Sequence, residues 1–158
     1  MVEKFLGLAV LNDLVADIVQ MTDKFKHRAI NLEVVPFPVR MKAEWNQLIQ
    51  VLSHLISNAV KYSHVSDLVI LQLTQASGWA IIQVSNKGDG IPLSQQSRIF
   101  KPLYQVDPSR DRATGKPGLG LSIVKHLAEG MGGKVAILSE PVYGSTFILR
   151  LPALGAKI

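Results

Sequence analysis

The sequence predicts an α/β fold of two layers, in which a mixed, mostly antiparallel sheet of five strands carries three main helices on one face. Two observations lead to this prediction. Segments with the period of a strand mostly stand in consecutive pairs that a short turn can join into hairpins, and segments with the period of a helix stand between these pairs. A doubly wound parallel sheet would alternate single strands with single helices, so the order of the segments disfavours it.

The size and composition are those of one compact domain. The chain has 158 residues, of which 47% are hydrophobic and 18% charged, a balance that fits a packed core and disfavours disorder. It contains no cysteine, which excludes disulfides, thiolate catalysis and cysteine-based metal sites. No apolar run approaches the roughly 20 residues that a membrane helix needs, so we expect this domain to make no membrane contact.

The formal net charge is +5, which suggests an anionic partner. The basic residues are scattered, however, and no aromatic residues are interleaved with them. We therefore expect no nucleic-acid binding. A nucleotide or an acidic partner protein accounts for the same charge.

The predicted helices cover residues 11–27, 45–62 and 119–131, each of which has the apolar period of an amphipathic helix. The second has the most extensive apolar face, made of Ile49, Leu52, Leu55, Ile56, Ala59 and Val60. A shorter helix is expected over residues 94–101, where Ser94 can act as the N-cap.

The predicted strands cover residues 31–35, 68–74, 80–85, 134–139 and 146–151. Turns at residues 77–78 and 143–145 join the second strand to the third and the fourth to the fifth. Residues 105–117 are polar and charged, and we expect them to form a loose loop.

Three features of the sequence can carry chemistry. On the long helix, His54, Asn58 and Lys61 fall within one narrow stripe beside the apolar face. A polar stripe is ordinarily the solvated side of a helix, but asparagine is a middling helix former and generally needs a reason in the middle of one.

The other two features are rich in glycine. Residues 86–92 follow an apolar strand, and Gly88 and Gly90 could let the backbone pass close to a flat ligand or simply form a turn. Residues 115–121 open the last helix, and the free N–H groups of a helix N-terminus bind phosphate readily. Neither a dinucleotide-binding fingerprint nor a Walker P-loop matches this second stretch.

In their order and spacing, these features resemble the ATP-binding catalytic domain of two-component sensor histidine kinases, in the GHKL ATPase superfamily. The resemblance extends from about residue 11 to residue 152. Residues 52–63 are similar to the N box, 84–92 to the G1 box, 98–104 to the F box and 118–125 to the G2 box. It implies the Bergerat fold, with residues 11–158 as the catalytic domain and residues 1–10 as the remnant of a connecting segment.

The resemblance also implies ATP and Mg²⁺ as cofactors and His54, Asn58 and Lys61 as the catalytic set. Asn58 would ligate Mg²⁺ through its side-chain oxygen and Lys61 would approach the phosphates. Residues 105–117 would form a lid over the triphosphate. The residues implied to bind the nucleotide are Asn58, Lys61, Tyr62, Asn86, Gly88, Gly90, Ile91, Tyr104, Arg110, Lys116, Gly118, Leu119, Gly120 and Leu121.

Several positions depart from the family pattern, among them Gln105 and Pro117, and two are the most informative. His54 stands where ATP-hydrolysing members carry a glutamate that activates water, so it favours a kinase over an ATPase. Asn86 stands where most members place an aspartate that accepts a hydrogen bond from adenine. An asparagine accepts without charge and can also rotate and donate, so we predict a weaker bond to adenine and relaxed discrimination between ATP and GTP.

A phosphoacceptor histidine in this family is followed by an acidic residue, and none of His27, His54, His64 and His126 is. The resemblance therefore implies transfer of the γ-phosphoryl group to a histidine on a separate dimerisation domain, with a response regulator as an indirect partner. It also implies a cytoplasmic domain of a parent protein that can be membrane-anchored. Two alternatives stay open: a degenerate nucleotide-binding module without phosphotransfer, and a serine kinase or ATPase of the same superfamily.

Overall fold

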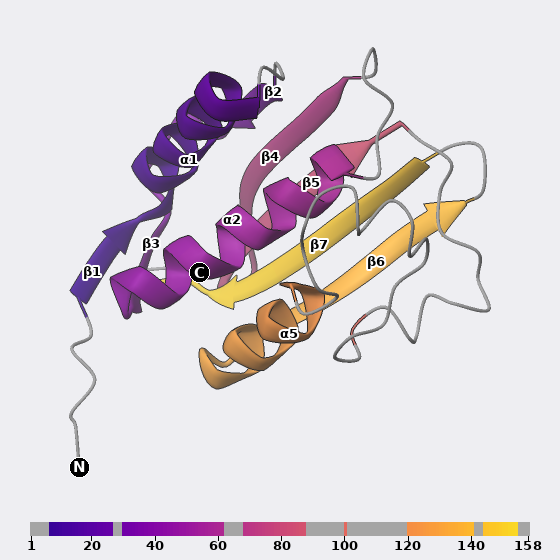
Figure 1. The fold of residues 1–158 in the computed structure, drawn as a ribbon. Helices are drawn as coiled ribbons and strands as arrows, with labels where there is room; N and C mark the ends of the chain where they lie inside the picture. Colours follow the sequence, from indigo (N-terminus) through magenta and orange to yellow (C-terminus); the bar gives the residue numbers. More distant parts are fainter. Residues whose placement is uncertain are drawn as a thin grey trace.

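The protein's structure, a computed structural model, describes residues 7–26, 30–61, 68–87, 100, 120–140 and 144–154. In chain order the elements are β1 (Gly7–Val10), α1 (Leu11–Lys26), β2 (Ile30–Val34), β3 (Arg40–Ala43), α2 (Trp45–Lys61), β4 (Val69–Ala76), β5 (Trp79–Asn86), α5 (Gly120–Gly130), β6 (Lys134–Glu140) and β7 (Gly144–Pro152) (Figure 1). The three main helices and five strands predicted from the sequence are all present, with ends displaced by one or two residues. The helix predicted over residues 94–101 lies outside the described residues, apart from Phe100.

The main sheet has five strands in the order β2-β4-β5-β7-β6. β2 runs parallel to β4, and every other neighbouring pair is antiparallel. α1, α2 and α5 lie on one face of this sheet (Figure 1). The prediction of a two-layer fold with a mixed, mostly antiparallel sheet is therefore confirmed.

The core lies between the helices and the inner face of the sheet. Side chains alternate along each strand, so every second residue of β4, β5 and β7 points toward the helices. Leu71, Leu73, Ile82, Val84, Phe147, Leu149 and Leu151 have no exposed surface. The apolar face of α2 packs on them through Leu48, Val51, Leu52, Leu55, Ile56 and Ala59, which are all at most 1% exposed. Burial of this face holds α2 firmly along the centre of the sheet.

The turn between β4 and β5 has the backbone of a tight hairpin. Ser77 and Gly78 have positive φ angles of 52° and 84°. Two left-handed residues in a two-residue loop match the right-handed twist of the flanking strands. The predicted turn at residues 77–78 is confirmed, and the two strands extend to its edges.

A second, two-stranded sheet was not predicted from the sequence. β1 pairs antiparallel with β3, so Gly7 is opposite Ala43 and Val10 is opposite Arg40. The assignment of residues 1–10 to a connecting segment stays a prediction, but residues 7–10 have a regular partner here. Strands of four residues are too short for a periodic pattern, and their partners lie far apart in the chain.

Asn12, in the first turn of α1, secures the segment that leads into β3. Its Nδ2 donates to the carbonyl oxygens of Val35 and Phe37, at 3.3 and 2.9 Å. Its Oδ1 accepts from the N–H of Val39 at 2.8 Å. The carboxamide therefore satisfies three backbone groups of the segment between β2 and β3, which lies outside the regular strands.

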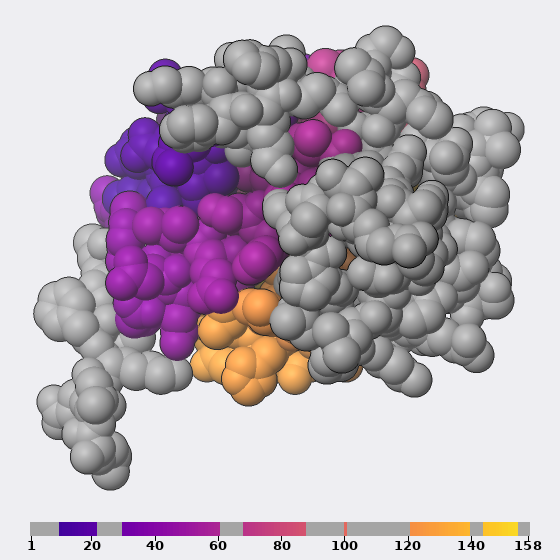
Figure 2. Space-filling view, in the orientation of Figure 1, coloured from indigo at the N-terminus to yellow at the C-terminus, as the bar shows by residue number. Residues whose placement is uncertain are grey.

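The helical face of the molecule presents α1, α2 and α5 side by side (Figure 2). None of the helices in the described ranges has both the length and the apolar character to cross a membrane.

Candidate functional site

The site begins with α2, because this helix carries the predicted catalytic stripe. Glu44 caps its N-terminus: one carboxylate oxygen accepts from the N–H of Asn46 at 3.1 Å, and the other from the N–H of Gln47 at 3.0 Å. A carboxylate there satisfies two backbone donors and meets the positive end of the helix dipole. The cap and the buried apolar face together determine where His54 and Asn58 lie.

Asn58 is half-buried, and its amide has a definite orientation. Its Nδ2 donates to the carbonyl oxygen of His54, one turn earlier, at 2.8 Å. In the described part of the chain no donor contacts its Oδ1. The amide is therefore tethered through nitrogen and can offer its oxygen to a ligand.

The structure brings part of the predicted site together. His54 is half-buried one turn before Asn58, and Lys61 is the last residue of α2. Gly120 and Leu121 are the first two residues of α5, which packs against α2. Leu121 is 6% exposed and belongs to the core, so its side chain supports the helix pair. The predicted site residues outside the described ranges are Tyr62, Gly88, Gly90, Ile91, Tyr104, Arg110, Lys116, Gly118 and Leu119.

Asn86, the last residue of β5, is buried, with 5% of its surface exposed. Its Nδ2 donates to the carbonyl oxygen of Ala59 at 2.9 Å, and its Oδ1 accepts from the N–H of Ser145 at 3.2 Å. Asn86 thus connects β5 to two elements. It is bonded to α2 at Ala59, the residue that follows Asn58, and to β7 at Ser145. Sequence reasoning singled out Asn86 but not these two partners, since neither contact is local.

Gly144 lies at the point where β7 meets the end of β5. Its φ is +106°, and a Cβ at this position would stand 2.1 Å from the carbonyl oxygen of Asn86. Only glycine combines such a φ with such an approach. The predicted turn over residues 143–145 gave a correct position for this glycine, but the structure makes it the first residue of β7.

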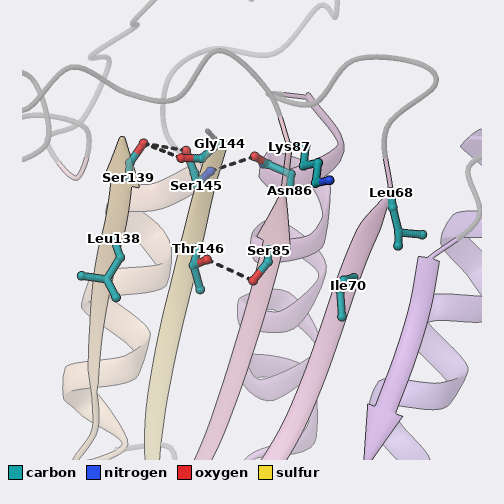
Figure 3. Close-up of a pocket in the computed structure, with 10 residues that line it drawn as sticks. All are labelled: Leu68, Ile70, Ser85, Asn86, Lys87, Leu138, Ser139, Gly144, Ser145 and Thr146. Atoms are coloured by element: carbon teal, nitrogen blue, oxygen red, sulfur yellow. Dashed lines mark hydrogen bonds between the residues drawn. The ribbon is translucent and has the colours of Figure 1, made fainter. Parts of the chain in front are cut away.

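A cavity of about 530 Å³ lies at the same ends of the strands, on the outer face of the sheet (Figure 3). Ile70, Ser85, Thr146 and Leu138 form one cross-strand row along it. The Ser85 and Thr146 hydroxyls are hydrogen-bonded at 3.0 Å. These side chains alternate with the buried ones that face the helices, so the row and the predicted catalytic stripe lie on opposite faces of the sheet.

Comparison with known proteins agrees with this geometry. A family model described as histidine kinase-, DNA gyrase B- and HSP90-like ATPase matches residues 43–155, which is more than half of the chain. The sensor-like histidine kinase SenX3 of Mycobacterium tuberculosis is 40% identical over 119 residues, covering 75% of this chain and 29% of that protein. The adaptive-response sensory kinase SasA of Prochlorococcus marinus is 34% identical over 148 residues, covering 91% of this chain and 39% of that protein. The chain thus spans about a third of these two relatives.

Solved structures show the same fold. The mycobacterial sensor histidine kinase MprB superposes with a TM-score of 0.80 at 21% identity, covering 94% of this chain and 98% of that one. The catalytic domain of the histidine kinase ThkA gives 0.80 at 24% identity, covering 94% of this chain and 95% of that one. Full-length ShkA in complex with AMPPNP gives 0.80 at 25% identity, covering 99% of this chain and 33% of that one. The chain belongs to the family of histidine kinase-, DNA gyrase B- and HSP90-like ATPases, and its fold is that of a histidine kinase ATP-binding catalytic domain.

Proposed function

We propose that this chain is the catalytic domain of a sensor histidine kinase, which binds ATP and transfers its γ-phosphoryl group to a histidine on a separate dimerisation domain. The observation that carries the proposal is the arrangement on α2, where a half-buried Asn58 follows His54 by one turn. The sensor kinases SenX3 and SasA resemble the chain over most of its length. ShkA, whose fold is similar, binds the ATP analogue AMPPNP.

The Asn58 amide suits a magnesium ion held mainly by phosphates. Its nitrogen is occupied by the carbonyl of His54, and its oxygen is a hard, neutral ligand of the kind that Mg²⁺ takes. Within residues 7–26, 30–61, 68–87, 100, 120–140 and 144–154, no three His, Asp or Glu side chains could hold a metal ion. Oxygens of the nucleotide and of water would supply further ligands. Bound Mg²⁺ would neutralise charge on the triphosphate.

The chain's own residues would position the substrate. Lys61, at the end of α2, would approach the phosphates as a point charge. The imidazole of His54 would orient the phosphoryl group or a bound water, because it replaces the glutamate that serves as the water-activating base in hydrolysing relatives. Phosphoryl transfer needs mainly positioning and charge stabilisation, which these groups can supply. The domain would work in the cytoplasm, where ATP is available.

A calorimetric titration with AMPPNP, with and without Mg²⁺, tests nucleotide binding. We expect magnesium-dependent binding in the wild type, weakened roughly 10- to 100-fold in Asn58→Ala, since contacts to charged partners are worth roughly 1.5–3 kcal/mol. Gln50→Ala is the matched control, because Gln50 is an exposed side chain of the same helix. It should bind as the wild type does. Equal affinities for the wild type and Asn58→Ala would remove Asn58 from the site.

A transfer assay then separates the kinase from its alternatives. The domain is mixed with the dimerisation domain of its parent protein and labelled ATP, and acid-labile phosphohistidine is measured. Transfer supports the kinase. ATP binding without transfer would favour a degenerate module, and steady ATP hydrolysis without an acceptor would favour an ATPase.

A further inference from the structure

The carboxamide of Asn86 has opposite hydrogen-bonding roles at its two ends. Its nitrogen donates to a carbonyl oxygen of α2, and its oxygen accepts from an N–H of β7. A half-turn of the amide would set its NH₂ against the N–H of Ser145 and its oxygen against the carbonyl of Ala59. Both buried bonds would then become repulsive contacts. These two bonds oppose the rotation on which the predicted relaxed discrimination between ATP and GTP depends.

The hydrogen bond from Asn86 to Ala59 lies near the C-terminal end of α2. Ala59 is the third residue counted from the C-terminal end of the helix, and the last four carbonyl groups of a helix have no partner within it. Asn86 thus acts as a capping donor that arrives from a distant strand. Ala59 has no exposed surface, so water does not take over this role.

The bond to Ser145 is reinforced by the backbone. Gly144 approaches the carbonyl of Asn86 so closely that no Cβ would fit between them. The pairing of β5 with β7 ends at this point, with Asn86 opposite Ser145. Asn86 is therefore held from the sheet side by Ser145 (Figure 3), while its bond to Ala59 holds the end of α2.

We infer that Asn86 is a positioning residue, which fastens the last turn of α2 to the sheet and so determines where Asn58 stands relative to the nucleotide. The functional half of this inference rests on the proposed function of Asn58. An aspartate, although nearly the same shape, has no N–H to give Ala59 and would bring a buried negative charge to the negative end of the helix dipole. Asn86→Asp should therefore release the last turn of α2 from the sheet.

Hydrogen exchange measured by NMR tests the fastening without any nucleotide. In the wild type, the side-chain NH₂ of Asn86 should exchange at least tenfold more slowly than that of the exposed Asn46. In Asn86→Ala and Asn86→Asp, backbone N–H groups of the last turn of α2 should exchange about tenfold faster, in line with the loss of one buried hydrogen bond.

Two control variants match the change in place and in chemistry. Ser85→Ala removes a hydroxyl that bonds to β7 from the neighbouring position but does not reach α2. Asn12→Ala removes a carboxamide with the same donor and acceptor roles, at the far end of the domain. Neither should change exchange at the end of α2 relative to the rest of the helix. Equal exchange of the Asn86 and Asn46 side chains, or the same response in the controls, would overturn the inference.

A double-mutant cycle tests whether the attachment of α2 to the sheet by Asn86 affects nucleotide binding through Asn58. If Asn86 acts through Asn58, Asn86→Ala should weaken AMPPNP binding about tenfold in Mg²⁺, and much less once Asn58 is alanine. Additive effects would show that Asn86 does not act through Asn58. Absence of binding in the wild type would overturn the proposed function, while the exchange measurements would still decide whether Asn86 holds α2.

Discussion

Substitution of Gly144 by alanine would test the junction of β5 with β7 directly. The new Cβ would lie 2.1 Å from the carbonyl oxygen of Asn86 and 2.9 Å from the Cα of Lys87. Both contacts are with backbone, so relief requires β7 to move away from β5. The residue would also have a φ of +106°, which an alanine adopts at a cost of about 1–3 kcal/mol.

The loss of stability in Gly144→Ala can be estimated by comparison with Gly78. This glycine also has a positive φ, 84°, but an added Cβ meets nothing within 4 Å. Gly78→Ala should therefore cost only the backbone strain, about 1–2 kcal/mol. Gly144→Ala should cost this strain plus overpacking of about 1–3 kcal/mol, so we expect a total loss of roughly 2–5 kcal/mol.

Urea unfolding followed by tryptophan fluorescence measures both variants against the wild type. The difference between them isolates the steric contact, because both substitutions add the same methyl group to a residue with positive φ. The Asn86 fastening depends on the same junction, so exchange at the end of α2 should rise in Gly144→Ala alone. If Gly144→Ala proves no less stable than Gly78→Ala, the close approach of β7 to Asn86 is not present in solution.

Two further outcomes follow from the contacts described. Glu44→Ala removes the cap of α2 and should lower the free energy of unfolding, measured by urea unfolding, by about 1 kcal/mol. Glu44→Asp should retain much of the stabilisation by the cap. Equal stability of the wild type and both variants would contradict the capping role. Rotation of the Asn86 amide to suit guanine would break two buried hydrogen bonds, so the structure predicts that GTP binds at least tenfold more weakly than ATP in a competition titration. Equal affinities would restore the relaxed discrimination predicted from the sequence.

Much of the fold could be predicted because its signals are local. The apolar face of α2 has the period of a helix, and the β4–β5 hairpin has both alternating strands and a turn that glycine permits. The order of these elements then leaves few ways to cover one face of a sheet. β1 and β3 escaped prediction because four residues carry no readable period and their pairing joins distant parts of the chain.

The candidate site, like the fold, could be predicted from the sequence only in part. The sequence by itself determined that His54 and Asn58 share a helix face, since their spacing alone places them one turn apart. It also identified Asn86 as a position of interest and predicted a turn over residues 143–145. Only the tertiary structure decided what Asn86 does, because its partners, Ala59 and Ser145, become neighbours only when α2 and β7 pack against the end of β5. A side-chain amide has one donor end and one acceptor end, and which backbone groups satisfy them is a property of the packed fold.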